Sequence, residues 1–427
     1  MAALCNNGDA GRSVVTRKFG TFQSSNIEEQ LKATELPDYV PPNFPVYLPN
    51  FVKYKDLEDF PFGKIIKQRH FLLDEDWTFL NHGAFGSMLK ESLSTQQLLE
   101  DYVERQPVRF IDRELFPLIV HSQKRLAQFV RCKATDISFV ENATMGTNVV
   151  LNSLNVDRKS TIYYLNTTYG AVKKSLKQLQ QKTGVQLQEE NLIPPIQSTE
   201  DILKVVKNTL KDGTKLAIFD HIPSNAAFVM PVKELVDICH QKNVPVLIDG
   251  AHALGAIDLN IPDIGSDYYV SNCHKWLCGP KGCAFLYVKP EEQKGLKDYT
   301  PYLALQCSLN FWECVGPEVI RSRITNVLHR AVKLLKTKWN GILLAPLEMH
   351  STMCCVSLPS RLYEGREISY SSAEEIQNIL YNDHHIEVPI KEYGGKLFVR
   401  ISVHIYNEIE EYQKLADAVI SLLDLYE

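Results

Sequence analysis

The stretch of residues 246–281 constrains this chain more than any other. An apolar run, residues 244–248, ends in the carboxylate Asp249, and a second β-rich run, residues 268–270, leads within a few residues to Lys275. In an open parallel sheet, ligands bind outside the carboxyl ends of the strands. We therefore expect this carboxylate and this lysine to meet over one crevice.

A carboxylate and a lysine over one crevice suit pyridoxal phosphate. The lysine amine can form a Schiff base with the aldehyde, and the carboxylate can keep the pyridine nitrogen protonated, so that the ring accepts electrons from a substrate carbanion. Such a lysine must lose its proton, which partial burial and a nearby positive centre favour. Taken singly, Asp249 could be a strand-end turn residue and Lys275 a solvated loop cation.

Two motifs carry a resemblance to a known family. D-G-A-H at residues 249–252, followed by S-N-C-H-K-W at residues 271–276, resembles the class V aminotransferase superfamily. Within this superfamily, the chain most resembles the branch of isopenicillin-N-epimerase-like proteins, which include plant L-cysteine desulfhydrases and C–S lyases. The resemblance runs from about residue 79 to about residue 406. It implies an α/β fold of type I, with a mainly parallel sheet between helices and a smaller C-terminal α+β domain.

The resemblance also implies roles for single residues. It makes Lys275 the catalytic Schiff-base residue, with His274 beside it in the cofactor site, and sets His252 against the phenolic oxygen of the cofactor. A satisfied buried histidine is the alternative for His252. Arg400, in F-V-R-I-S, resembles the arginine that takes the substrate α-carboxylate in a planar bidentate contact. The alternative for Arg400 is a surface arginine on an edge strand.

A phosphate site is predicted where a short strand meets a helix. Residues 137–140 favour a strand, residues 141–147 form a small polar turn, and residues 149–154 have apolar helical spacing. Free N–H groups at a helix start, together with the helix dipole, favour an anion. We assign Ala143 and Thr144 to the cofactor phosphate. The alternative is an ordinary helix cap by Asn142 or Thr144.

Two further strand ends resemble the cofactor site of the family. Tyr169 follows the predicted strand 161–165 and corresponds to the aromatic residue that stacks on the pyridine ring, although a turn tyrosine is the alternative. Ser224 or Asn225 follows the predicted strand 216–220 and corresponds to the position that bonds the ring oxygen; we choose Ser224.

His82 lies in the motif F-L-N-H-G-A-F-G, which resembles the family's opening motif. It could face the ligand or be structural. A helical stretch at about residues 88–104 follows the motif.

The order of elements indicates two domains. Predicted strands and helices alternate through residues 79–300, which is typical of a parallel sheet with right-handed crossovers. Residues 301–427 form the smaller domain. Residues 1–40 lack periodicity and are expected to be disordered. Residues 41–78 begin with a proline-rich run that forbids a helix and indicates an extended arm.

The smaller domain is expected to contain an antiparallel sheet under helices. One long helix is predicted over residues 310–339. Strand-like alternation occurs at residues 353–358, 386–390 and 397–403, and helices are expected at about 373–382 and 408–423.

Composition narrows the class of partners. The net charge is −5, with both signs interspersed, and no basic stripe indicates nucleic acid. No apolar run approaches the roughly 18 residues of a spanning helix. Ten cysteines are scattered without a zinc pattern, and we interpret them as reduced thiols of a cytoplasmic protein. A transit peptide at the N-terminus is the alternative. The resemblance implies a small-molecule amino-acid substrate and a homodimer.

One segment departs from the family. After residues 287–290, relatives continue for some twenty residues with a glycine-threonine element that reaches the phosphate of the partner subunit's cofactor. Here the chain passes almost directly from Glu291 to Asp298. The departure predicts weaker cofactor binding or a site that closes differently.

Three functions remain open. The leading one is a pyridoxal-phosphate-dependent lyase that breaks a C–S bond in cysteine, a cysteine conjugate or a sulfoxide. An epimerase or racemase would use the same residues with a second acid. A non-catalytic dimeric scaffold is the third. A cysteine desulfurase is disfavoured, because no cysteine lies between Cys355 and Arg400 to act on a mobile loop.

Overall fold

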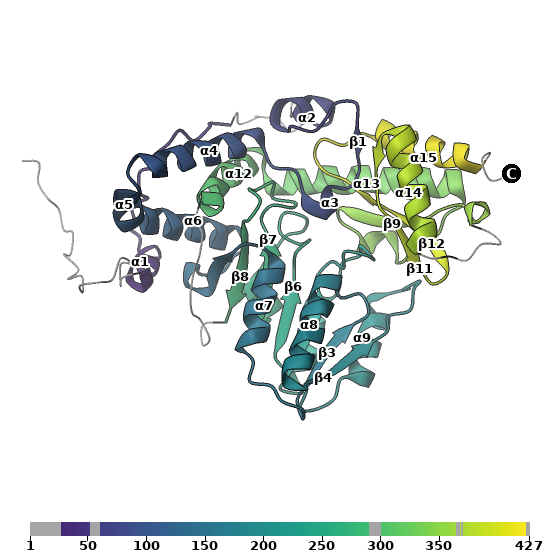
Figure 1. Ribbon diagram of the computed structural model, residues 1–427, viewed down its shortest axis with the longest axis horizontal. Helices are drawn as coiled ribbons and strands as arrows, with labels where there is room; N and C mark the ends of the chain where they lie inside the picture. Colours follow the sequence, from purple (N-terminus) through teal and green to yellow (C-terminus); the bar gives the residue numbers. More distant parts are fainter. Residues whose placement is uncertain (1–26, 52–59, 290–299, 364–367, 369, 424–427) are drawn as a thin grey trace, which may run out of the picture.

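The chain was examined as a computed structural model, which describes residues 27–51, 60–289, 300–363, 368 and 370–423. Its centre is a seven-stranded sheet with the strand order β2-β8-β7-β6-β5-β3-β4 (Figure 1). The strands are β2 (Ile137–Val140), β3 (Thr161–Leu165), β4 (Gln186–Glu190), β5 (Leu216–Asp220), β6 (Val246–Asp249), β7 (Tyr268–Asn272) and β8 (Ala284–Val288).

The sheet is parallel except for β8, which runs antiparallel to both neighbours. Every residue of β5 and β6 is buried, as expected for central strands covered on both faces. These two strands are in register with Asp220 opposite Asp249. Their carboxyl ends therefore bring two acidic side chains together at one edge.

Helices cover both faces of the sheet. On one face α7 (Ala143–Ser153) and α8 (Gly170–Thr183) bury Val150 and Leu176 against Leu247 (Figure 1). The larger core lies on the other face. Among the helices that contribute to it are α4 (Lys90–Arg105), α6 (Leu115–Phe129), α9 (Thr199–Thr209), α10 (Val232–His240), α11 (Ile261–Ile264) and α12 (Thr300–Val315).

The second domain is an antiparallel sheet with the order β11-β12-β9. Its strands are β9 (Met353–Ser357), β11 (Ile390–Tyr393) and β12 (Lys396–Ser402), and its helices are α13 (Pro317–Trp339), α14 (Tyr370–His384) and α15 (Ile409–Leu423). An early segment joins this domain: β1 (Thr78–Phe79) pairs in parallel with β10 (Ile386–Glu387). The N-terminal motif at residues 79–86 thus lies between the two domains, and its helix is α3 (His82–Phe85).

Several expected boundaries were wrong. The helix expected over residues 310–339 is two helices, because Gly316 lies between α12 and α13 with a φ of 93°. The strand expected at 386–390 is also two, β10 and β11, because Pro389 lacks the N–H that a continuous ladder needs. Helix α12, at the predicted start of the smaller domain, packs on α4 and α6.

The N-terminal region is partly ordered. Residues 27–33 form helix α1 (Ile27–Ala33) although disorder was expected for residues 1–40; Leu31 packs against the core, and Lys124 donates a hydrogen bond to the Thr34 carbonyl. Residues 37–51 contain no helix, as expected, whereas α2 (Lys64–His70) follows within the predicted arm. No helix among the described residues is long and apolar enough to cross a membrane. Residues 1–26 lie outside the described residues.

Candidate active site

A pocket of about 570 Å³ opens at the carboxyl ends of β5, β6 and β7. This is the position at which open α/β sheets bind ligands. Eight of the nine predicted site residues line it: Ala143, Thr144, Tyr169, Ser224, Asp249, His252, His274 and Lys275. The ninth, Arg400, lies behind the pocket wall.

Lys275 and His252 face each other across the pocket floor. Lys275 Nζ lies 3.0 Å from His252 Nε2, and the Trp276 indole N–H donates to His252 Nδ1 over 3.4 Å. Because an indole nitrogen can only donate, Nδ1 is the unprotonated nitrogen, and neutral His252 carries its proton on Nε2. That proton points toward Lys275, which can accept it when the lysine is in its neutral amine form.

Burial makes the Lys275 amine easier to deprotonate. Burial lowers the pKa of Lys275 to about 8, an effect opposed by Asp249. Burial also lowers the pKa of His252 well below its ordinary value, and the Lys275 charge adds to this. Lys275 is therefore a partly deprotonated amine near neutral pH, as a nucleophilic lysine requires.

Two carboxyls lie beside this amine, although only Asp249 was predicted. Burial raises the pKa of Asp249, while the Ala251 N–H, 3.0 Å from its Oδ1, and Lys275 oppose the shift. Asp220 also lines the pocket, and its pKa is raised well above the ordinary value by burial and then by Asp249. Asp220 ends its strand as Asp249 does, so the sequence contained the signal that would have found it.

The start of α7 has one free donor rather than two. The Asn142 side chain caps the helix by accepting from the Met145 N–H at 2.8 Å, and the Ala143 N–H donates to Asn272 Oδ1 at 2.9 Å. Within the described part of the chain, the Thr144 N–H has no acceptor. The turn is therefore a helix start capped by Asn142 that leaves the Thr144 N–H as a donor beside the pocket, and the assignment of Ala143 and Thr144 to the cofactor phosphate stays a prediction.

The mouth of the pocket is more open than its floor. Tyr169, the residue before α8, is 45 % exposed.

His274 Nδ1 lies 3.3 Å from the Cys283 carbonyl, to which it can only donate. Burial lowers the pKa of His274 to about 4, so its ring is neutral near pH 7.

Arg400 is buried, which excludes the exposed edge-strand alternative. Its Nη1 donates to the carbonyl and hydroxyl oxygens of Ser224, at 2.7 and 3.0 Å, and its Nη2 donates to Asn81 Oδ1 at 2.8 Å. The Nε atom is buried and has no partner among the described residues. Among the described residues, Ser224 links Arg400 to the pocket wall.

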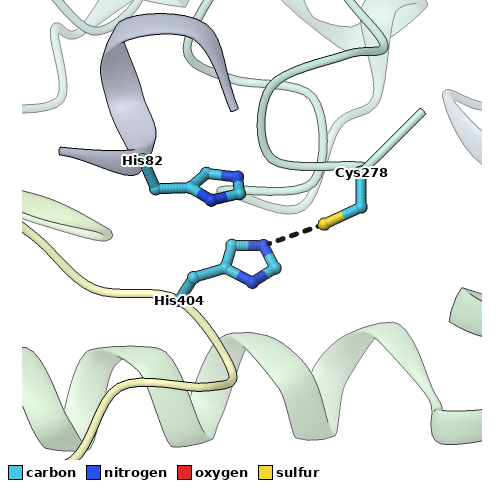
Figure 2. A group of neighbouring side chains, drawn as sticks. All are labelled: His82, Cys278 and His404. Carbon is cyan, nitrogen blue, oxygen red and sulfur yellow. Dashed lines mark hydrogen bonds between the residues drawn. The ribbon is translucent and has the colours of Figure 1, made fainter. Parts of the chain in front are cut away.

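His82 lies outside the residues that line the pocket. Residues 273–283, which join β7 to β8 and carry Lys275, are called the lysine loop. The His82 ring is fully buried beneath this loop, next to His404 and Cys278 (Figure 2). The short connection predicted between Glu291 and Asp298 lies outside the described residues.

The fold and the site define the fold-type-I class of pyridoxal-phosphate enzymes. The apo cysteine desulfurase of Thermococcus onnurineus NA1 superposes with a TM-score of 0.70 over 86 % of this chain and 99 % of its own, at 18 % identity.

Sequence comparisons place the chain further. The family described as aminotransferase class V matches residues 114–303. A putative L-cysteine desulfhydrase of Oryza sativa subsp. japonica is 31 % identical over 81 % of this chain and 83 % of its own. The isopenicillin N epimerase of Streptomyces clavuligerus is 24 % identical over 82 % of this chain and 96 % of its own. The chain belongs to the class-V aminotransferase family of pyridoxal-phosphate-dependent enzymes.

The pocket fits this cofactor. Its residues suit each part of the group: a buried amine with a lowered pKa would suit the aldehyde, a pair of acidic side chains the ring nitrogen, and the Thr144 N–H at the helix start the phosphate. Among the described residues the buried Asp220 Oδ2 has no hydrogen-bond partner, which further indicates that a polar group is expected there.

Proposed function

We propose that this protein is a pyridoxal-phosphate-dependent C–S lyase that acts on cysteine or an S-substituted cysteine and eliminates across Cα–Cβ. The observation that carries the proposal is the buried Lys275 amine, which lies 3.0 Å from His252 and within one pocket with Asp249. The resemblance to a plant L-cysteine desulfhydrase supports the choice of substrate class.

Each pocket residue would contact a different part of the cofactor. When bound, pyridoxal phosphate supplies an electron sink for the substrate α-carbon. Lys275 would hold it covalently, Asp249 would face its ring nitrogen, and the Thr144 N–H would donate to its phosphate. The exposed ring of Tyr169 is free to cover one face of it, and the His252 N–H can donate to its phenolic oxygen.

Proton movement centres on Lys275. With a pKa of about 8, its free amine can take the proton from Cα and give it up again near neutral pH. The Cβ–S bond then breaks and the electron pair leaves with sulfur. For cysteine and one water, the balanced products are sulfide, ammonia and pyruvate.

Arg400 positions the substrate. Its guanidinium is buried without a carboxylate partner in the described chain, and charge-assisted pairs of this kind are strong. A substrate α-carboxylate would exchange with the Ser224 oxygens for Nη1 and would engage Nε. Holding that group would orient the substrate and so select which bond at Cα is broken.

Assembly and location are proposed as a homodimer in the cytoplasm. Phe85 at the pocket edge is 76 % exposed, and Met145 in the first turn of α7 is also exposed, so a second copy would cover apolar surface there. The nine described cysteines carry no disulfide, which suits a reducing compartment. Light scattering of purified protein tests the dimer.

The experiment for the reaction is a substrate panel. Purified protein loaded with pyridoxal phosphate is given cysteine, cystine, S-alkyl cysteines and their sulfoxides, and sulfide or thiol, ammonia and pyruvate are measured. We expect equimolar ammonia and pyruvate from at least one of them, and none with Lys275→Ala. Absence of all products with a fully loaded enzyme contradicts the lyase.

The second candidate is an epimerase, favoured by the match over 96 % of the isopenicillin N epimerase chain. It needs a second acid on the opposite face of the substrate. Its signature is exchange of the α-hydrogen with solvent together with inversion at Cα, without release of sulfur or pyruvate.

A further inference from the structure

Two histidines from distant parts of the chain meet beneath the lysine loop. His82 begins α3, and His404 follows β12 in the smaller domain. Their rings are stacked, with centroids 4.1 Å apart and planes inclined by 19° (Figure 2). Both are fully buried, so any hydrogen-bond partners of their ring nitrogens lie inside the protein.

Each ring bonds a carbonyl of the lysine loop. His82 Nε2 lies 3.0 Å from the carbonyl oxygen of Lys275, and His404 Nε2 lies 3.1 Å from that of Trp276. A carbonyl can only accept, so both Nε2 atoms carry protons and donate. The tautomers agree with the remaining atoms: His82 Nδ1 accepts from the Tyr406 hydroxyl at 2.7 Å, and His404 Nδ1 has no donor near it in the described chain.

A metal ion is the competing explanation for this cluster. Cys278 Sγ lies 3.5 Å from His404 Nε2, and the three candidate ligand atoms fall within 4.8 Å of one another. A metal, however, needs unprotonated nitrogens whose lone pairs converge at roughly 2 Å. Stacked rings direct their lone pairs side by side, and the loop carbonyls already use the Nε2 protons.

The charge states also favour hydrogen bonding. Burial raises the pKa of the Cys278 thiol, which therefore stays protonated and is a poor ligand. Burial lowers the pKa of His404 to about 4 and that of His82 well below its ordinary range. Both rings are neutral near pH 7, so they hold the loop without placing a charge beside the Lys275 amine.

The same two segments hold the substrate arginine. Asn81, the neighbour of His82, accepts from Arg400 Nη2, and Arg400 lies four residues before His404. The two segments therefore hold the lysine loop and Arg400 at the same time. A shift of either segment would move both groups relative to each other.

We propose that His82 and His404 are positioning residues, a clamp that fixes the backbone of Lys275 and Trp276 so that the Lys275 amine stays aimed at the pocket in register with Arg400. The proposal rests on the proposed function of Lys275 as the residue that holds the cofactor. His82 and His404 do not line the pocket; they act through the loop carbonyls that they bond.

The experiment compares His82→Leu with His82→Gln. Leucine removes the donor to the Lys275 carbonyl, whereas a glutamine amide can still donate to it. Two measurements are made on cofactor-free protein: amide hydrogen exchange of residues 275–279, and the rate at which added pyridoxal phosphate becomes attached to Lys275, trapped by borohydride and located by mass spectrometry. Loss of one buried hydrogen bond corresponds to about tenfold in rate.

The expected pattern is specific. His82→Leu should exchange faster in this segment and load Lys275 about tenfold more slowly, and His82→Gln should recover most of the loss. His350→Leu is the matched control, because His350 is another buried histidine beside a backbone carbonyl, that of Pro346, away from the loop. It should load Lys275 at the parent rate.

Other outcomes overturn the clamp. A folded His82→Leu protein with parent exchange and parent loading contradicts it, as does a stoichiometric metal ion in the purified parent protein. If His82→Leu does not fold, Tyr406→Phe removes only the hydroxyl that fixes the His82 tautomer; it should shift both measurements in the same direction, and no shift contradicts the clamp. Failure of the parent protein to attach the cofactor at Lys275 would instead reject the proposed function.

Discussion

Asp220 and Asp249 are paired in register on neighbouring parallel strands, and both carboxyls line the same pocket. Two buried carboxyls this close do not both ionise readily. The pKa of Asp220 is raised well above its ordinary value by burial and by Asp249, whereas the Ala251 N–H and Lys275 oppose the rise at Asp249. We infer that Asp220 holds the proton and Asp249 the charge.

A charged Asp249 beside a protonated Asp220 predicts unequal losses of activity for two isosteric substitutions. Asp249→Asn should slow loss of the substrate α-proton by several orders of magnitude, because an amide cannot keep the cofactor ring nitrogen protonated. Asp220→Asn should cost less than about tenfold, because an amide resembles a protonated carboxyl. Exchange of the substrate α-hydrogen with solvent, followed by NMR, measures both. Equal losses would show that the charge is shared.

Lys275→Ala should abolish turnover and the covalent attachment of the cofactor while the fold remains. The substitution removes the amine that lies 3.0 Å from His252 and shortens a side chain without adding volume. The visible absorbance of loaded protein checks the covalent attachment, and the melting temperature checks that the fold remains. Turnover that persists together with covalent attachment would reject Lys275.

Cofactor loading should depend on pH in a defined direction. Only the neutral amine of Lys275 attacks the aldehyde, and its pKa is about 8, so the loading rate should rise with pH and level off above about pH 8. The Asp249 charge raises this pKa, so Asp249→Asn should move the profile to lower pH. Stopped-flow absorbance of cofactor-free protein measures it, and a profile centred near the pKa of an exposed lysine, about 10, would contradict the burial of this amine.

Arg400→Gln should raise the KM for the amino acid by roughly ten- to a hundredfold, since a charge-assisted hydrogen bond contributes about 1.5–3 kcal/mol. Arg400→Lys keeps the charge but loses the planar fork, so it should recover only part of the affinity. Initial-rate kinetics separate KM from kcat. An unchanged KM in Arg400→Gln would place the substrate carboxylate elsewhere.

Gly86→Ala should destabilise the protein and disturb the lysine loop. Gly86 has a φ of 69°, and a Cβ there would lie 2.0 Å from the carbonyl oxygen of His274. Backbone strain of this kind costs about 1–3 kcal/mol before the clash is added. Gly213→Ala is the matched control, because its φ is 79° and a Cβ would meet nothing within 4 Å. Thermal unfolding should show a clearly larger drop for Gly86→Ala.

Sequence periodicity was sufficient for most of the fold. Alternation of apolar runs with helical spacing predicts the parallel sheet, and strands that end in Asp249 or lead to Lys275 predict where their side chains meet. Periodicity carries no strand direction, so the reversed β8 was not foreseen. The breaks at Gly316 and Pro389 depend on single residues inside otherwise regular patterns.

The sequence was enough to predict many of the residues that line the pocket, but it was not enough to predict their hydrogen bonds. A motif names His252, but its protonation follows from the indole of Trp276, which packs against it only in the folded chain. In the same way, Asn272 occupies the Ala143 N–H from a strand 129 residues away, which leaves Thr144 as the free donor. Both facts depend on tertiary contacts between distant segments.

The pairing of β1 with β10 has a consequence for how the protein is made. Residues 78–79 leave the ribosome early, yet their partner strand, residues 386–387, is synthesised about three hundred residues later. Until then the segment around Leu80 and His82 lacks the smaller domain that buries it. Such late, long-range closure slows folding and leaves apolar surface open to aggregation in the meantime. The nascent chain is thus expected to need chaperone protection until its C-terminal strands emerge.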